Sequence, residues 1–168
     1  MFARTLATLL LVLAISASAQ NFAAQFPVRV LAAHNVQRAR LGIPRLKWDP
    51  ALGTAAAAYA QQLAFTGRFE HSDRGQRRGI GENLWSGTHG AFSVEAMVGA
   101  WASERRQFVP GFFPNTSRTG RWMDVAHYTQ IVWPTTQRIG CALAATPRTD
   151  YLVCRYAPAG NINGKPVP

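Results

Sequence analysis

Helical sequence patterns come first in this chain, and strand patterns gather near its end. Periodic apolar residues predict helices over residues 26–41 and about 93–107, and an alanine-rich run predicts another over 51–64. From Trp122 onward the sequence has the character of strands, and residues 46–48 are a further short strand candidate. Because the helices precede clustered strands without regular β-α-β alternation, this order predicts an α+β fold of packed layers.

Capping residues mark the ends of these predicted helices. Gly42 ends the first helix, and Gly67 ends the second. Asp49 and Pro50 suit the N-cap and the first turn of the second helix, and Ser93 suits the N-cap of the third. The many alanines of the second helix should allow another layer to pack closely against it.

Residues 1–19 have the pattern of a secretory signal peptide. Arg4 supplies a positive start, residues 6–15 are apolar, and Ala17-Ser18-Ala19 is a small-residue cleavage site. The apolar run is shorter than the about 20 residues that span a bilayer, which disfavours an uncleaved membrane anchor. We therefore predict a secreted, extracellular protein, periplasmic in a Gram-negative bacterium. Residues 20–168 would form one domain with a short Gly- and Pro-rich tail and no integral membrane segment.

Two cysteines, Cys141 and Cys154, are the only ones in the chain. They lie in two partly alternating stretches, residues 138–145 and 150–156, which flank a turn-like sequence at 146–149 and predict two neighbouring strands. An even number of cysteines in an exported chain favours a disulfide bond, and two buried free thiols are the alternative. We predict that Cys141 and Cys154 are bonded across the two strands.

Arginine dominates the charge of the chain. The sequence has 18 basic and 8 acidic residues and a formal charge of +10, and removal of Arg4 with the signal peptide leaves +9. Such a surface suits anionic lipid headgroups, acidic wall polymers or other polyanions, although solubility alone could also explain it. No basic run exceeds two residues and no stripe alternates basic with aromatic side chains, so we expect no nucleic-acid partner.

Two histidines and two glutamates, His71, Glu82, Glu104 and His127, stand beside turn glycines and tryptophans. A glycine-rich connection between His71 and Glu82 can fold back on itself, and Glu104 lies on the third predicted helix, one turn beyond Trp101. Imidazole nitrogens and carboxylate oxygens suit zinc, although another divalent cation or acid–base chemistry would also use them. In the zinc interpretation the histidines are the direct ligands, and the glutamates bind through water or orient an imidazole.

Other interpretations of these residues remain open. His127 would share one face with Thr129 if its segment were a strand. Glu104 could instead pair with Arg38 or Arg105 on a solvated face, and any of the histidines could be a hydrogen-bonded structural residue. The two other histidines are expected to be structural, His34 in helix packing and His89 in a surface turn.

The motifs of the chain resemble those of the CAP superfamily, which comprises cysteine-rich secretory proteins, antigen 5 and pathogenesis-related 1 proteins and is also called the SCP domain. The resemblance extends over about residues 30–162, and Ala126 departs from it where members often have glycine. The matching motifs are His34–Arg38, Gly81–Leu84, Trp101–Glu104, His127–Trp133 and Tyr151–Asn161.

This resemblance implies a compact three-layer α-β-α sandwich around a central, mostly antiparallel sheet. It also implies a central cleft lined by His71, Glu82, Glu104 and His127. The single cysteine pair makes the chain similar to bacterial and plant-type single-domain members. We expect a monomer.

Two functions follow as alternatives. The first is a secreted binding module, with or without a metal, whose partners are lipids, sterols or an anionic or protein surface in a host-interaction or defence role. The second is a hydrolase, such as a peptidase, that uses metal-bound water or Ser72. The sequence has no Gly-x-Ser-x-Gly or His-Glu-x-x-His motif, and Ser72 and His71 would point to opposite sides of an extended chain. We therefore favour the binding module over an enzyme.

Overall fold

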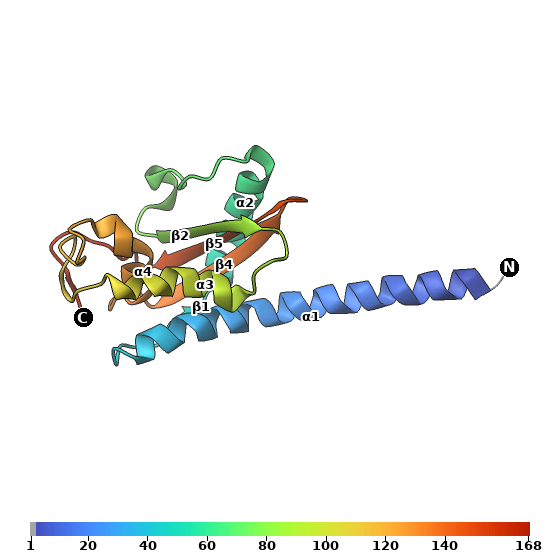
Figure 1. The fold of residues 1–168 in the computed structure, drawn as a ribbon, viewed down its shortest axis with the longest axis horizontal. Coiled ribbons are helices and arrows are strands. Elements are labelled where there is room, and N and C mark those ends of the chain that lie inside the picture. The colour runs from blue at the N-terminus through green and yellow to red at the C-terminus, as the bar shows by residue number, and fades with distance from the viewer. Residues whose placement is uncertain (1–2) are drawn as a thin grey trace.

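The structure is a computed structural model that describes the backbone of residues 3–168 and the side chains of residues 20–168 (Figure 1). The side chains of the predicted signal peptide lie outside the described part. Eight elements form the main layers, and shorter ones connect them. The main elements are α1 (Ala3–Ala39), β1 (Lys47–Trp48), α2 (Pro50–Thr66), β2 (Gly81–Thr88), α3 (Val94–Ser103), α4 (Ala126–Ile131), β4 (Arg138–Ala145) and β5 (Thr149–Ala157).

The central sheet has the strand order β1-β4-β5-β2. Strands β2, β4 and β5 pair antiparallel, and only β1 runs parallel to its neighbour β4. Helix α2 covers one face of this sheet, and α1 and α3 cover the other (Figure 1). The predicted α-β-α sandwich with a mostly antiparallel sheet is therefore confirmed.

Each face of the sheet has its own apolar core. On the α2 side, the buried alanines Ala56 and Ala60 pack against Leu84 and Val153 of the sheet. The other core is larger and contains the side chains of α1, α3 and α4. The residue pattern of each strand supplies both cores, because successive side chains point to opposite faces.

Helix α2 begins and ends where its capping residues predict. The carboxylate of Asp49 accepts hydrogen bonds from the backbone N–H groups of Ala51 and Leu52 at 2.9 and 3.3 Å. Gly67 ends the helix in the left-handed conformation with a φ of 68°. The start of α2 lies so close to β4 that a Cβ atom at Gly140 would lie 2.1 Å from the backbone nitrogen of Gly53. Only glycine allows this approach of helix and strand.

The segment from Trp122 to Ile131 is helical, and the prediction of a strand there is wrong. A 3-10 turn, η3 (Trp122–Val125), leads directly into α4, which contains His127. The β-branched residues of this segment favour strands, but a carboxylate 23 residues upstream binds the first N–H groups of α4. This tertiary contact outweighs the local preference.

The first helix also begins earlier than predicted. Helix α1 continues upstream of residue 26, and Pro27 lies inside it. Among the described residues, no helix combines the length and apolar character needed to cross a membrane.

Four shorter elements, two strands and two 3-10 turns, lie near the C-terminus and in the loops. The Gly- and Pro-rich end carries β6 (Pro166–Val167), which pairs antiparallel with β3 (Gly111–Phe112), and Val167 is buried. Short 3-10 turns form η1 (Arg74–Arg77) and η2 (Glu104–Arg106). The end of the chain therefore packs against the fold beside the loop that follows α3.

Cys141 and Cys154 form a disulfide bond, as predicted. They are directly opposed in the β4–β5 ladder, with Cα atoms 4.1 Å apart, and no free cysteine remains. The bond therefore links neighbouring strands at the centre of the sheet.

The double substitution Cys141→Ala/Cys154→Ala should lower the free energy of unfolding by about 3 kcal/mol, because the bond closes a loop with a sequence separation of 13 in the unfolded chain. Urea denaturation of the variant and the wild type measures this difference. Intact-mass analysis after alkylation under denaturing, non-reducing conditions provides the check on the wild type. Two alkylated thiols in that sample would show that the bond is absent.

Candidate functional site

Glu82 on β2 is a buried carboxylate with four close polar contacts and a longer one of 3.7 Å from its Oε1 to Nε of Arg77. Its Oε1 accepts from the backbone N–H of Ser72 at 3.0 Å and lies 2.7 Å from Nδ1 of His71. Its Oε2 accepts from the Ser72 hydroxyl at 2.8 Å and lies 3.0 Å from Nη2 of Arg155, its cross-strand neighbour on β5. The loop after α2 is thereby bound to the edge of the sheet.

The Glu82 side chain is fully buried, yet its pKa is lowered from the ordinary value of 4.5. Burial by itself raises the pKa, but the hydrogen bonds from His71 and Ser72 and the charge of Arg155 outweigh it. Glu82 is therefore ionised at neutral pH and stays paired. It holds its neighbours in place and is not a free base.

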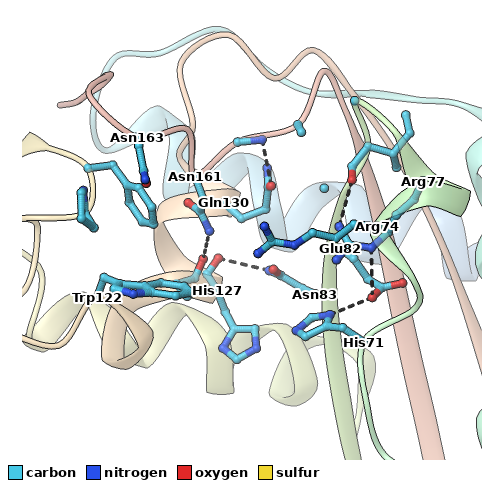
Figure 2. A pocket seen from close by; sticks show the side chains of 18 of the residues that line it. His71, Arg74, Arg77, Glu82, Asn83, Trp122, His127, Gln130, Asn161 and Asn163 are labelled. Atoms are coloured by element: carbon cyan, nitrogen blue, oxygen red, sulfur yellow. Dashed lines mark hydrogen bonds and ion pairs between the residues drawn. The ribbon is translucent and has the colours of Figure 1, made fainter.

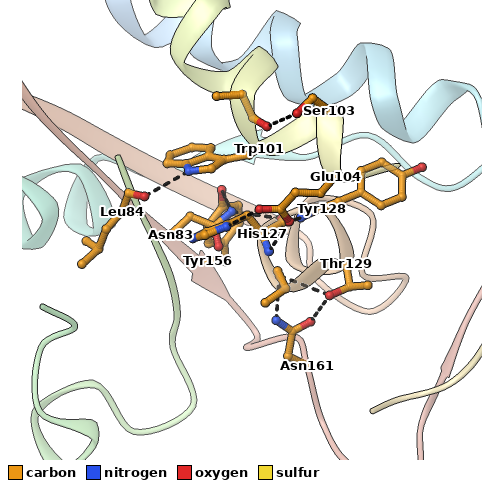
Figure 3. Close-up of polar contacts among 12 residues, drawn as sticks. Asn83, Leu84, Trp101, Ser103, Glu104, His127, Tyr128, Thr129, Tyr156 and Asn161 are labelled. Atoms are coloured by element: carbon orange, nitrogen blue, oxygen red, sulfur yellow. Dashed lines mark hydrogen bonds and ion pairs between the residues drawn. The ribbon is translucent and has the colours of Figure 1, made fainter. Parts of the chain in front are cut away.

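Glu104 holds His127 in the same way as Glu82 holds His71 (Figure 3). Its Oε2 accepts from the backbone N–H groups of His127 and Tyr128, both at 3.0 Å, at the start of α4. Its Oε1 lies 2.6 Å from Nδ1 of His127. The imidazole also stacks on the Trp101 ring, with ring centroids 6.0 Å apart and planes within 16°. One carboxylate thus caps the helix and orients the histidine, and neither of the alternative arginine partners binds it.

His71 and His127 therefore have the same hydrogen-bond arrangement. In each, Nδ1 faces a carboxylate, which can only accept a hydrogen bond, so the neutral imidazole carries its proton on Nδ1. The lone pair of each ring is then on Nε2. A carboxylate behind a histidine is the usual way in which proteins orient a metal-binding imidazole.

Both histidines line a cavity of about 700 Å³ (Figure 2). Glu82 also lines it, whereas Glu104 lies behind His127 and does not. The structure thus brings three of the four predicted site residues to one cavity wall. Further lining residues are Arg74, Arg77, Arg78, Asn83, Trp122, Gln130, Asn161 and Asn163.

The cavity wall has two imidazole nitrogens with free lone pairs rather than a full set of metal ligands. Within residues 20–168, no three histidine, cysteine, aspartate or glutamate side chains are grouped so that they could hold a metal ion together. The glutamates are already bonded to the histidines and to neighbouring N–H groups. A cation on the two imidazoles would therefore keep several positions open for water or a ligand.

Ser72 does not have the position of a nucleophile. Its residue is 6% exposed, and its hydroxyl donates to Glu82. It does not line the cavity. Its observed role is to hold the Glu82 carboxylate.

Comparison with known proteins shows the family of this chain. The profile of the CAP family, described as the cysteine-rich secretory protein family, matches residues 31–156. The chain belongs to the CAP family. It is 38% identical to pathogenesis-related protein 1C of Nicotiana tabacum over 161 residues, which cover 94% of this chain and 89% of the relative. It is also 37% identical to pathogenesis-related leaf protein 6 of Solanum lycopersicum, covering 95% and 93% of the two chains.

A solved CAP-like structure has a similar fold. NaASP2, whose crystal structure was determined with Zn2+, superimposes with a TM-score of 0.72 at 28% sequence identity. The match covers 83% of each chain. The fold predicted from the sequence motifs agrees with this likeness.

Sequence reasoning missed several residues that connect this CAP domain's helices to its cleft. The Asn83 amide donates to the backbone oxygen of His127 and to the Tyr156 hydroxyl, both at 3.1 Å. That hydroxyl lies 2.8 Å from Nε2 of the buried His34, whose Nδ1 lies 2.8 Å from the Val30 carbonyl. A hydrogen-bond chain therefore runs from α1 to His127. The Gly-Glu-Asn motif was the available signal for Asn83, but its partners are distant in sequence.

The C-terminal segment closes the cavity on the other side. The Asn161 amide donates to the Ala126 carbonyl at 2.9 Å and accepts from Thr129 at 2.7 Å (Figure 3). The Gln130 amide accepts from the N–H of Gly160 at 3.0 Å. These contacts bind the segment after β5 to α4.

The other two histidines are structural, as expected, but they differ. His34 is fully buried. Its pKa is lowered from 6.5 to about 4, because burial and the charge of Arg38 outweigh the hydrogen bond to the Val30 carbonyl, which raises the pKa. His89 lies after β2 with half of its side chain exposed, and its Nδ1 is 2.7 Å from the buried carboxylate of Asp150. Arg38 itself donates to backbone carbonyls and not to Glu104.

Glu104→Ala should lower the free energy of unfolding by about 2 kcal/mol, because two helix N–H groups and an imidazole lose their acceptor. Urea denaturation at neutral pH measures the loss. Glu70→Ala removes an exposed glutamate outside the cavity and is the matched control, with an expected change below about 0.5 kcal/mol. Equal losses in the two variants would contradict the assigned role of Glu104.

Stability should fall as the pH drops below about 6.5, because His34 has a lower pKa folded than unfolded. The unfolded chain then binds the proton more readily, and the stability present above that pH is lost progressively toward pH 4. We expect His34 to contribute about 2 kcal/mol of loss between pH 7 and pH 5. Urea denaturation across this range should show that the free energy of unfolding depends less on pH in His34→Gln than in the wild type. The same pH dependence in both proteins would refute the role assigned to His34.

Proposed function

We propose that this CAP-domain protein is an exported binding module whose cleft holds a divalent cation, zinc, on Nε2 of His71 and Nε2 of His127. The observation that carries the proposal is the matching arrangement of the two imidazoles. Each is oriented through Nδ1 by its own glutamate and lines the same cavity. Two independent carboxylate–histidine pairs directed at one cavity are hard to explain as core packing.

The donor chemistry fits zinc better than the harder cations. Neutral imidazole nitrogen is a common zinc ligand, whereas calcium and magnesium prefer shells of oxygen. Glu82 and Glu104 would offset the charge of the ion without binding it directly. When bound, zinc would offer open coordination positions to oxygen or nitrogen atoms of a ligand. The structural relative NaASP2, solved with Zn2+, supports this choice of metal.

Binding is favoured over hydrolysis by the state of the polar groups. The Ser72 hydroxyl donates to the buried Glu82 carboxylate and does not line the cavity, so it is poorly placed to attack a ligand there. Glu82 is ion-paired and fully buried, so it is poorly placed to take a proton from water in the cavity. With no activated nucleophile or free base of this kind, the cleft is suited to holding a ligand.

We further propose that the ligands are lipids, sterols or an anionic surface, and that the protein acts outside the cell in a defence or host-interaction role. The predicted signal peptide and the basic charge support export and an anionic partner. The names of relatives are consistent with this role, since several are pathogenesis-related proteins and another is the secreted protein RBT4 of Candida albicans.

Zinc should bind the wild type at about pH 7.5 and at least about tenfold more weakly at pH 5.5, because a protonated imidazole has no lone pair to donate. His71→Ala and His127→Ala should each weaken binding strongly, and Glu104→Gln by about tenfold through loss of orientation. Calorimetric titration of protein purified without a histidine tag measures all four.

His89→Ala is the matched control, since it removes a half-exposed histidine that does not line the cavity. Its zinc affinity should equal that of the wild type. Unchanged affinity in both cleft variants, or affinity independent of pH, would exclude the cleft as the metal site.

A further inference from the structure

The two sides of the cleft differ in chemistry. Figure 2 shows Trp122 on one side and Arg74 and Arg77 on the opposite side, with His71 and His127 between them. Trp122 packs edge-on against Phe113, with ring centroids 5.5 Å apart, and keeps 39% of its surface exposed. The cavity therefore has an aromatic side and a basic side.

Most of the other polar groups on the wall are already bonded within the protein. The amides of Asn83, Gln130 and Asn161 each bond to another segment of the fold. Glu82 is the only acidic residue that lines the cavity in the described part of the chain, and its side chain is fully buried. These groups shape the wall, but most of their hydrogen-bonding atoms are already paired within the protein and are not available to a ligand.

The three arginines of the wall are not equivalent. Arg77 donates to the backbone oxygens of Ser72 and Ile80, both at 3.2 Å, and so holds its own loop together. Arg74 and Arg78 are exposed, and within residues 20–168 neither guanidinium has a hydrogen bond or ion pair. They are the cations of the wall that remain free to bind a ligand.

The loop that carries these two arginines is bound at both ends. The Tyr59 hydroxyl donates to the Glu70 carbonyl at 2.7 Å, and the N–H of Ala159 donates to the Gly79 carbonyl at 2.8 Å. Asp73, the acid next to Arg74, accepts a backbone N–H of its own turn at 2.7 Å and does not line the cavity. The backbone therefore presents the arginines in a preorganised arrangement.

We infer that the basic side of the cleft is an oxyanion subsite, in which Arg74 and Arg78 bind a phosphate or carboxylate group of the ligand. The planar guanidinium fork matches both groups. Three arginines and one glutamate on the wall leave a formal charge of +2 with neutral histidines, which favours anions. Trp122 would pack on the apolar part. The inference rests on the proposed function, since it names the ligand class of the same cleft.

The subsite is tested by calorimetry on metal-free protein at about pH 7.5, where a phosphate monoester carries nearly two charges. The probes are inorganic phosphate, dihexanoyl phosphatidate and dihexanoyl phosphatidylcholine, with both lipids below their micelle concentrations. The two lipids share their apolar part, but choline cancels the phosphate charge of the second. Metal is removed on a chelating resin, because soluble EDTA is itself a carboxylate anion.

We expect phosphatidate to bind at least about tenfold more tightly than phosphatidylcholine, since hydrogen bonds to charged groups are worth about that factor or more. Arg74→Gln/Arg78→Gln should lose this preference and leave the affinity for phosphatidylcholine unchanged. Arg118→Gln/Arg148→Gln removes the same charge from exposed arginines outside the cavity and is the control. Equal binding of the two lipids, or equal loss in both double variants, would overturn the inference.

The remaining outcomes identify the source of the anion and separate this inference from the metal proposal. Binding of inorganic phosphate that depends on the two arginines supports the subsite with a free anion as sufficient ligand. Arginine-dependent binding of phosphatidate alone supports it with a lipid headgroup. Arg74→Gln/Arg78→Gln should bind zinc like the wild type. If the wild type binds zinc normally but shows no preference for phosphatidate, only the oxyanion subsite is rejected. If it prefers phosphatidate but does not bind zinc, only the metal proposal is rejected.

Discussion

The buried carboxylate of Glu82 is the constraint on which the cleft depends. A charge without exposed surface must be paired, and its partners come from the opposite strand, through Arg155, and from the loop before β2, through His71 and Ser72. Satisfying the carboxylate therefore binds the whole 67–80 connection to the sheet edge. The same contacts orient one histidine and set the position of the arginine-bearing loop. The Glu82 carboxylate therefore contributes both to the fold and to the arrangement of the candidate site.

Glu104 has the same two roles behind His127, but it acts on a helix rather than on a strand and a loop. There the carboxylate satisfies the N–H groups at the start of α4 and orients His127 in the same contact. Asn83 and Tyr156 connect that histidine to the buried His34 of α1. The cleft thus lies between β2, α4 and the loops that follow α2 and β5, which explains why residues far apart in the chain converge on it.

The binding role proposed for this cavity rests on the state of the polar groups around it. Glu82 and Glu104 orient the two histidines, and Ser72 is buried behind the wall. Among residues 20–168, the unbonded groups on the wall include Nε2 of each histidine, the guanidinium groups of Arg74 and Arg78, and the exposed Trp122 ring. Membership of the CAP family is established by the match over residues 31–156 and by relatives such as tobacco pathogenesis-related protein 1C. The contrast between the basic and aromatic sides of the wall adds a specific chemical expectation for the ligand of this chain.

The sequence by itself determined the features that depend on neighbouring residues. Asp49 and Gly67 mark the two ends of helix α2, because caps act within one turn. The alternating stretches around Cys141 and Cys154 predicted two neighbouring strands joined by a disulfide bond. The family motifs predicted the layers and the four site residues. Only the tertiary structure decided that His127 lies on a helix, because a carboxylate 23 residues away caps it against a local preference for strand. It also decided that Glu104 stands behind the wall rather than on it, and which arginines are free, since both depend on contacts between distant segments.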